Sequence, residues 1–313
     1  MEQQGISTRR KHTRKLWANI KRDRYLLLLV AIPVLYFIVF HYIPMYGIQI
    51  AFKRYSPGLG IWGSKWVGLK WFKEFFSSLY AKRVIGNVLI LNIMRLVLAF
   101  PLPVIFALLL NELRFSRYKR VVQTISYMPH FISTVVVVGM MVTFLSPNGG
   151  IVNQFITAFG GKPINFMVES KYFRFLYIFS GVWQNLGWDS IIYLAALSGI
   201  DVEQYEAARI DGAGRWQQAV HITLPGIAPT IIILMILDVG NMMSVGYEKI
   251  ILMYNPATYD VADVISSYVY RMGIVNNDFS FATAVDLFNS VVNCLLLVTV
   301  NKISKTVSDI ALW

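Results

Sequence analysis

The sequence predicts an all-α integral membrane protein with six transmembrane helices. Of its 313 residues, 56% are hydrophobic and only 15% are charged, which is far more apolar than a soluble domain of this length. The apolar residues gather in runs of roughly 18 or more, the length needed to cross a hydrocarbon core about 30 Å thick. Polar segments separate these runs, so the chain is expected to cross the membrane repeatedly.

Six apolar runs are the candidate spans. They cover residues 25–43, 86–110, 121–145, 173–197, 227–246 and 282–301. The first run follows a basic start, but it is too long for a secretory signal and no cleavage site of small residues follows it. We therefore expect it to be retained, with residues 1–24 as a basic N-terminus and residues 25–313 as a single transmembrane domain.

Flanking charge predicts that both termini are cytoplasmic. Eight of the 29 basic residues lie between Arg9 and Arg24, directly before the first run, where they also suit anionic membrane lipid. This placement, rather than a nucleic-acid partner, accounts for much of the net charge of +12. The first outer segment, residues 44–85, does not fit this orientation well, because it contains seven basic residues and a single acidic one, Glu74. Long translocated segments tolerate such charge.

The segment between the fourth and fifth spans, residues 201–225, is polar and helical in pattern. Asp201 is a suitable N-cap, and Gly212 with Gly214 is expected to end the first helix, because glycine accepts a left-handed turn. A second helical pattern then leads to Pro225 and the next span. Such a unit suits insertion into a groove on another protein, or it is an amphipathic connection that lies on the membrane surface.

This segment resembles the EAA loop of bacterial ABC-importer permeases. The positions that carry the resemblance are Glu206, Ala207, Ala208, Gly212, Ile222, Leu224 and Pro225. It implies the type I ABC-importer permease fold. It also implies that the loop docks in a cleft of an ATP-hydrolysing subunit, with coupling assigned to Glu206, Ala207, Ala208, Gly212, Leu224 and Pro225.

Further stretches are similar to the oligo- and polysaccharide permeases of this binding-protein-dependent family. They are Pro44–Gly47, Trp66–Leu69, Tyr247–Lys249, Leu252–Pro256, Ala262–Ser266 and Tyr268–Arg271. The resemblance implies a multi-pass protein of the bacterial plasma membrane that imports oligosaccharide or polysaccharide fragments. Its implied partners are a second homologous permease subunit, a cytoplasmic ABC ATPase dimer and an extracellular or periplasmic sugar-binding protein.

The chain offers no enzyme chemistry of its own. It has no phosphate-binding Gly-x4-Gly-Lys-Ser/Thr loop, so we expect ATP and Mg²⁺ to be bound by the partner ATPase and no cofactor by this chain. The four histidines are scattered without a second ligand at metal spacing. No nucleophile or acid/base pair is evident, so we expect no catalytic residue and no metal site.

Polar and tryptophan residues inside the spans are the candidates for a substrate pathway, because such groups are costly in lipid. They are Arg95, Trp183, Gln184, Asn185, Trp188, Asp238, Asn241, Asp286, Asn289 and Asn293. In one interpretation they line a water-filled cavity and bind sugar hydroxyls. In the other, Arg95 pairs with Asp238 or Asp286 and the amides join neighbouring helices.

Other functions stay open at this point. The same ABC architecture could carry a small sugar or a glycerol phosphate, although the spans hold few cations, Arg95 among them, and this scarcity disfavours phosphate. An ion-coupled secondary transporter would need no ATPase, and a membrane enzyme or scaffold would show no vectorial transport. Residues 201–225 argue against both of these functions. Within the ABC importer, the two permease subunits are expected to differ, and a homodimer is the alternative to this heterodimer.

Overall fold

The computed structural model describes residues 22–313. The predicted basic N-terminus, residues 1–24, therefore falls almost wholly outside the described residues. The chain divides into two compact units, Met1–Val67 and Gly68–Trp313. The second unit contains the candidate site residues named above.

The first unit is an apolar helical run followed by a small hairpin. Its elements are α2 (Arg24–Phe37), η1 (Ile38–Tyr42), α3 (Ile43–Met45), η2 (Tyr46–Phe52), β1 (Lys53–Arg54), α4 (Gly60–Gly63) and β2 (Lys65–Trp66). The helical run has a mean hydropathy of 2.5 over its most apolar window, and that window contains no buried residue, as suits a lipid-facing span. The strands pair antiparallel, with Lys53 opposite Trp66.

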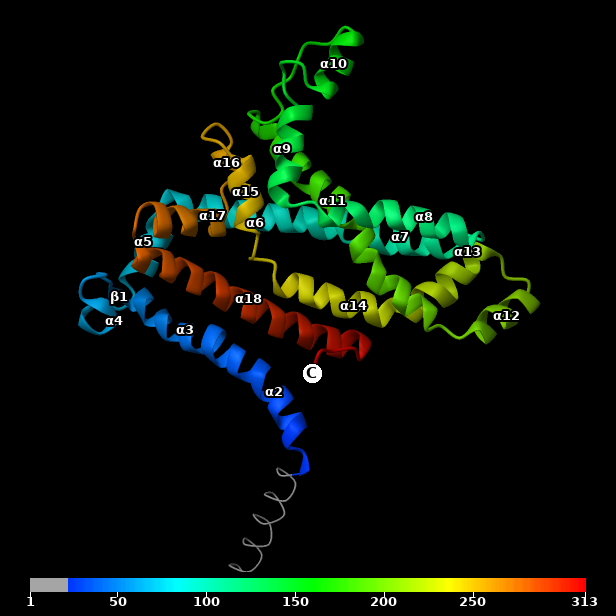
Figure 1. The fold of residues 1–313 in the computed structure, drawn as a ribbon, viewed down its shortest axis with the longest axis horizontal. Helices are drawn as coiled ribbons and strands as arrows, with labels where there is room; N and C mark the ends of the chain where they lie inside the picture. The colour runs from blue at the N-terminus through cyan, green and yellow to red at the C-terminus, as the bar shows by residue number, and fades with distance from the viewer. Residues whose placement is uncertain (1–21) are drawn as a thin grey trace, which may run out of the picture. The chain divides into compact units, whose positions relative to one another are not determined.

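Long helices make up the bulk of the second unit (Figure 1). They are α6 (Leu79–Met94), α7 (Pro101–Asn111), α8 (Ser116–Tyr127), α9 (Thr134–Phe144), α11 (Ser170–Ser198), α14 (Leu224–Gly240) and α18 (Phe279–Ser308). Within residues 22–313, four helical runs are long and apolar enough to cross a membrane, or five if the bent α8–α9 pair is one span. The polar residues of α11 keep it out of that group.

The predicted third span, 121–145, is not one continuous helix. The run Ser116–Phe131 and helix α9 meet at an angle of 97°. The break follows the 3₁₀ helix η4 (Met128–Phe131), which contains Pro129, and Ser133 then accepts the N–H of Val136 as the N-cap of α9. Because Pro129 lacks an N–H and Ser133 caps the following turn, the chain begins a new helix here instead of continuing the first one.

Prolines also explain two π turns that interrupt long helices. Turn η3 (Arg95–Ala99) precedes Pro101, and the N–H of Phe100 donates to the carbonyl of Arg95 at 2.9 Å. Turn η5 (Ala219–Thr223) likewise precedes Pro225 and joins α13 (Arg215–Gln218) to α14. Each π turn accommodates a proline, whose nitrogen cannot donate a hydrogen bond and whose ring crowds the carbonyl four residues earlier.

Helix α11 is the centre of the second unit. It packs against α7 and α14, and the shared core contains Val104, Ala107, Tyr193, Leu197 and Ile227. Helix α14 continues the contact to α18, where a Cβ on Gly240 would lie 2.5 Å from the Leu297 side chain. The predicted fifth span, 227–246, is longer than the helix, because α14 ends at Gly240 and Asn241 leaves the helical conformation with a φ of −101° and a ψ of 16°.

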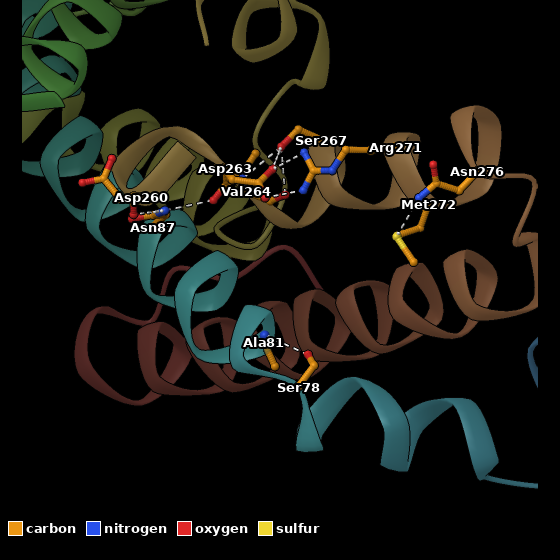
Figure 2. A network of polar contacts seen from close by, with 10 residues as sticks. All are labelled: Ser78, Ala81, Asn87, Asp260, Asp263, Val264, Ser267, Arg271, Met272 and Asn276. Carbon is orange, nitrogen blue, oxygen red and sulfur yellow. Dashed lines mark hydrogen bonds and ion pairs between the residues drawn. The ribbon is translucent and has the colours of Figure 1, made fainter. Parts of the chain in front are cut away.

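The outer segment, residues 247–281, is a set of short helices tied to α6 (Figure 2). Its elements are α15 (Tyr247–Met253), α16 (Tyr259–Ala262), α17 (Ile265–Tyr270) and η6 (Arg271–Val275). The Asn87 side chain of α6 donates to the carbonyls of Asp260 and Asp263, both at 3.0 Å. Arg271 pairs with Asp263, whose side chain is 1% exposed, so the segment is fixed by buried polar contacts.

Further short helices complete the unit. They are α5 (Lys70–Ser77), α10 (Ile151–Ala158) and α12 (Val202–Ile210). Helix α12 and α13 lie at one end of the long helices, and α5 and α17 lie at the opposite end (Figure 1). The segment that contains the predicted docking motif is thus well separated from the outer segment.

Candidate functional site

A cavity of about 600 Å³ lies between α7, α11 and α14. Helix α15 and the first residue of α9 complete its wall. The polar side chains in the lining are those of Arg95, Thr134, Tyr177, Gln184, Asn185, Asp189, Tyr193, Asp238, Asn241 and Lys249. Five of the ten predicted pathway residues are brought together here, namely Arg95, Gln184, Asn185, Asp238 and Asn241.

Arg95 and Asp238 form an ion pair across the cavity wall. The Nη2 atom of Arg95 lies 2.5 Å from Oδ1 of Asp238, and the two side chains are 41% and 23% exposed. The Nε atom of Arg95 is buried and has no hydrogen-bond partner. The pair therefore joins α6–α7 to α14, as the second interpretation predicts, and both residues also line the cavity.

The two amides of α11 are partly engaged by the protein. Gln184 donates to the carbonyl of Ile132 at 2.7 Å, and Asn185 lies 3.0 Å from Nδ1 of His130. Asn241, at the end of α14, is exposed and donates to the carbonyl of Leu237. Each amide keeps further donor or acceptor capacity for a ligand in the cavity, because an amide group can make several hydrogen bonds.

The other five predicted pathway residues do not line the cavity. Trp183 and Trp188 are 41% and 42% exposed, and the Trp188 ring stacks on His130 at 4.3 Å. On α18, Asp286 is exposed and Asn289 is buried, with an Oδ1 atom that accepts no hydrogen bond. Asn293 accepts from the N–H of Met243 and donates to Ser244, which joins α18 to the end of α14.

The packing of α18 explains why its polar residues do not line the cavity. This helix packs against α14, α17 and α5, whereas the cavity lies on the side of α14 that faces α11. The i, i+3, i+7 spacing correctly places three polar residues on one side of a helix. It does not say which neighbour that side meets.

The cavity is also lined by residues that were not among the predicted pathway residues. Lys249 comes from the outer segment, and Tyr177 and Tyr193 lie on α11. The Nζ atom of Lys249 donates to the carbonyl of Tyr177 at 2.9 Å, and burial lowers the Lys249 pKa to about 8. A signal was present: Lys249 stands directly before the apolar run Ile250–Met253 in a short helix.

The segment predicted to couple to an ATPase, residues 201–225 (the coupling loop), forms the predicted pair of helices. Asp201 caps α12 by accepting the N–H of Glu203 at 3.0 Å. Gly212 ends α12 with a φ of +81°, and the N–H of Ala213 donates to the carbonyl of Ala208. Gly214, which we expected to end α12 as well, instead caps the start of α13 with an ordinary φ of −70°.

The coupling loop exposes most of the motif residues. Glu206, Ala207, Gly212, Leu224 and Pro225 are exposed, and Ala208 is half-buried. Two nearby apolar side chains are also open, Ile210 at 87% and Trp216 at 80%. Large apolar side chains left exposed in this way favour a protein-binding surface.

The coupling loop is held to the rest of the unit by few contacts. Within the loop, Tyr205 of α12 hydrogen-bonds to Thr223 of η5 at 3.0 Å. Arg215 lies 3.8 Å from Glu112, at the end of α7. The loop between α7 and α8 and the coupling loop therefore lie at the same end of the molecule.

Comparison with known proteins gives the same assignment. Residues 99–305 match the family described as the binding-protein-dependent transport system inner membrane component. The chain is 46% identical over 288 residues to Protein LplB of Bacillus subtilis, covering 92% of this chain and 91% of that protein. It is 40% identical over 301 residues to the polygalacturonan/rhamnogalacturonan transport system permease protein YteP of Bacillus subtilis, covering 96% and 94%.

A solved structure is also closely similar. It is a bacterial alginate ABC transporter in complex with an alginate pentasaccharide-bound periplasmic protein, with a TM-score of 0.88 and 41% identity. The alignment covers 95% of this chain and all of the matched one. The chain thus belongs to the binding-protein-dependent transport system inner membrane component family, as a multi-pass membrane permease with the type I ABC-importer fold and not as an enzyme.

Proposed function

We propose that this chain forms one half of the translocation pore of an ATP-driven importer of oligosaccharide or polysaccharide fragments. The observation that carries the proposal is the cavity beside α11, in which amides, carboxylates and tyrosines converge. Sugars present hydroxyls that donate and accept hydrogen bonds, together with apolar C–H faces that pack on aromatic rings. The transport functions in the names of YteP and the alginate transporter support a carbohydrate cargo.

The proposed topology has six transmembrane helices with both termini in the cytoplasm. It counts α11 as a span and the bent α8–α9 pair as another. The contact of Arg215 with Glu112 supports a common side for the coupling loop and the basic loop after α7. Arg114, Arg117, Lys119 and Arg120 mark that side as cytoplasmic.

In this proposal, α12 docks into a separate ABC ATPase. The exposed Glu206, Ala207 and Gly212 carry the contact, and Leu224 with Pro225 transmits its movement to α14. ATP and Mg²⁺ bind to the ATPase, so the movement driven by ATP hydrolysis reaches the cavity through residues 201–225. The short α12–α13 connection and the Tyr205–Thr223 hydrogen bond support transmission as one body.

Two further partners complete the proposed importer. A second homologous permease supplies the other half of the pore, and the exposed Trp183 and Trp188 on α11 suit such a neighbour. An external sugar-binding protein delivers cargo at the outer segment. The alginate transporter structure contains a sugar-bound periplasmic protein, which supports this last partner.

Co-purification tests the proposal directly. The chain is expressed with its candidate second permease and ATPase, reconstituted in lipid, and assayed for ATP hydrolysis with a panel of oligosaccharides. We expect a stable complex whose hydrolysis rises severalfold with one class of oligosaccharide and its binding protein. Glucose and glycerol 3-phosphate serve as small-cargo controls. Stimulation by these alone, or hydrolysis by the purified chain without an ATPase, would contradict the proposal.

A further inference from the structure

Lys249 is a cation of the cavity that makes no ion pair. The other cation of the lining, Arg95, is already neutralised by Asp238. The Nζ atom of Lys249 instead contacts Tyr177 twice, through the backbone carbonyl at 2.9 Å and with the ring centre at 4.7 Å. The five ion pairs within residues 22–313 all involve other groups.

The ammonium group has donors to spare. An ammonium carries three N–H donors, and the carbonyl of Tyr177 accepts one of them. Gly181, one turn further along α11, leaves space beside the group, because a Cβ at that position would lie 3.4 Å from Nζ. A larger side chain at residue 181 would cover the approach from the cavity.

The groups packed around Lys249 provide no negative charge. Helix α15 packs against α9, which has no titratable side chain, and against α17, which has only Tyr268 and Tyr270. Asp189 lies eight residues beyond Gly181 on α11, about 12 Å along the helix axis. Glu248, the neighbour of Lys249 in sequence, is exposed and forms no ion pair with it. Such a desolvated cation calls for an anion from outside the chain.

We propose that Lys249 binds a carboxylate of the cargo, so that the imported fragments are acidic sugars of the uronic acid type. This inference rests on the proposed function and specifies its substrate class. One carboxylate oxygen accepts from Lys249, in a charge-assisted hydrogen bond that a neutral sugar cannot make. Gln184 and Asn241, in the same cavity, then remain for hydroxyl groups.

Lys249 could instead be only an anchor that fixes α15 to α11 through the carbonyl of Tyr177. Two variants separate these roles. Lys249→Gln keeps a donor for the carbonyl and removes the charge, whereas Lys249→Arg keeps the charge. Lys171→Gln is the matched control, because the same change is made at a lysine that is 67% exposed and outside the cavity.

The test compares one oligosaccharide with and without its charge. The assembled permease–ATPase complex is placed in lipid nanodiscs without the external binding protein, which would impose its own selectivity. Binding of trigalacturonate and of its neutral methyl ester is measured at low and high salt. We expect Lys249→Gln to weaken binding of the acid roughly tenfold, the effect of losing one charge-assisted hydrogen bond, and to leave the ester unchanged.

The other two variants are controls for the loss of charge. Lys249→Arg and Lys171→Gln should bind the acid as the unchanged protein does, and high salt should weaken only the acid. Equal losses for acid and ester in Lys249→Gln would make the residue an anchor and overturn the inference. Equal binding of acid and ester by the unchanged protein would also overturn it while preserving the proposed function, whereas a complex that binds and transports no carbohydrate would refute the function itself.

Discussion

The outer segment and the coupling loop use their polar residues in opposite ways. In the outer segment, Asp263 is 1% exposed and is bonded by Arg271 and Ser267, while Asn87 ties the backbone to α6. In the coupling loop, Glu206 is exposed, the Tyr205–Thr223 bond lies within the loop, and a long contact joins Arg215 to Glu112 at the end of α7. One region is cross-linked within the chain, and the other leaves its groups exposed, available to the proposed ATPase.

This difference indicates that the outer segment is a rigid support, whereas the coupling loop is suited to transmitting movement. Buried, fully bonded groups resist movement because every bond broken exposes an unsatisfied partner. The outer segment therefore holds Lys249 at a fixed place in the cavity wall. An exposed helix with few attachments can follow a bound protein, as coupling requires.

The largest expected effect is on stability in the outer segment. Arg271→Ala leaves the buried Asp263 carboxylate without its cation, which we expect to destabilise the unit by about 3 kcal/mol. Arg215→Ala is the matched change in the coupling loop, where both side chains are about half exposed, and it should cost under about 0.5 kcal/mol. Thermal unfolding of the purified variants in detergent measures both, and similar losses would erase the contrast between the two regions.

The next effect is on association and not on stability. Ala207→Trp places a large side chain on the exposed face of α12, where it should reduce co-purification of the ATPase at least about tenfold by obstructing a close fit. The unfolding temperature should stay unchanged because Ala207 is exposed. Ala158→Trp in α10 is the control, since that alanine is also exposed but lies in another segment. Undiminished ATPase binding by Ala207→Trp would remove α12 from the interface.

A third expectation concerns pH and the group that the outer segment holds. Burial lowers the Lys249 pKa from 10.5 to about 8, so its ammonium form is present below pH 8 and is lost above it. Binding of trigalacturonate should therefore fall about tenfold between pH 7 and pH 9. Lys249→Arg should remove this dependence because arginine stays charged over that range. Persistence of the full pH effect in Lys249→Arg would assign it to another group.

The coupling loop was predictable from sequence because its signals are local. A capping aspartate, a glycine at a left-handed turn and a helical pattern depend on a few adjacent residues. Asp201 and Gly212 act as expected. Gly214 does not, because two nearby glycines offer two places for a turn and only the backbone conformation shows which one is used.

The cavity was only half predictable because its composition depends on packing between distant segments. In a long membrane helix such as α18, the sequence pattern does not tell which neighbouring helix each side meets, so the faces of Asp286 and Asn289 could not be assigned. Lys249 lies 72 residues from its partner Tyr177, in a segment that hydropathy places outside the spans. The break of the third span was equally hidden, since Pro129 permits a bend without setting its angle.

The smallest expected effect sharpens the comparison within the coupling loop itself. Gly212 has a φ of +81° and open space around it, so Gly212→Ala adds only backbone strain, about 1 kcal/mol. Gly214→Ala is a matched control, because φ is −70° there and the nearest atom lies 3.7 Å from the new Cβ. Hydrogen exchange of the Ala213 amide, which closes the end of α12, should accelerate about fivefold in the first variant only. Equal exchange in both variants would mean that the left-handed turn does not hold α12 in its docking conformation.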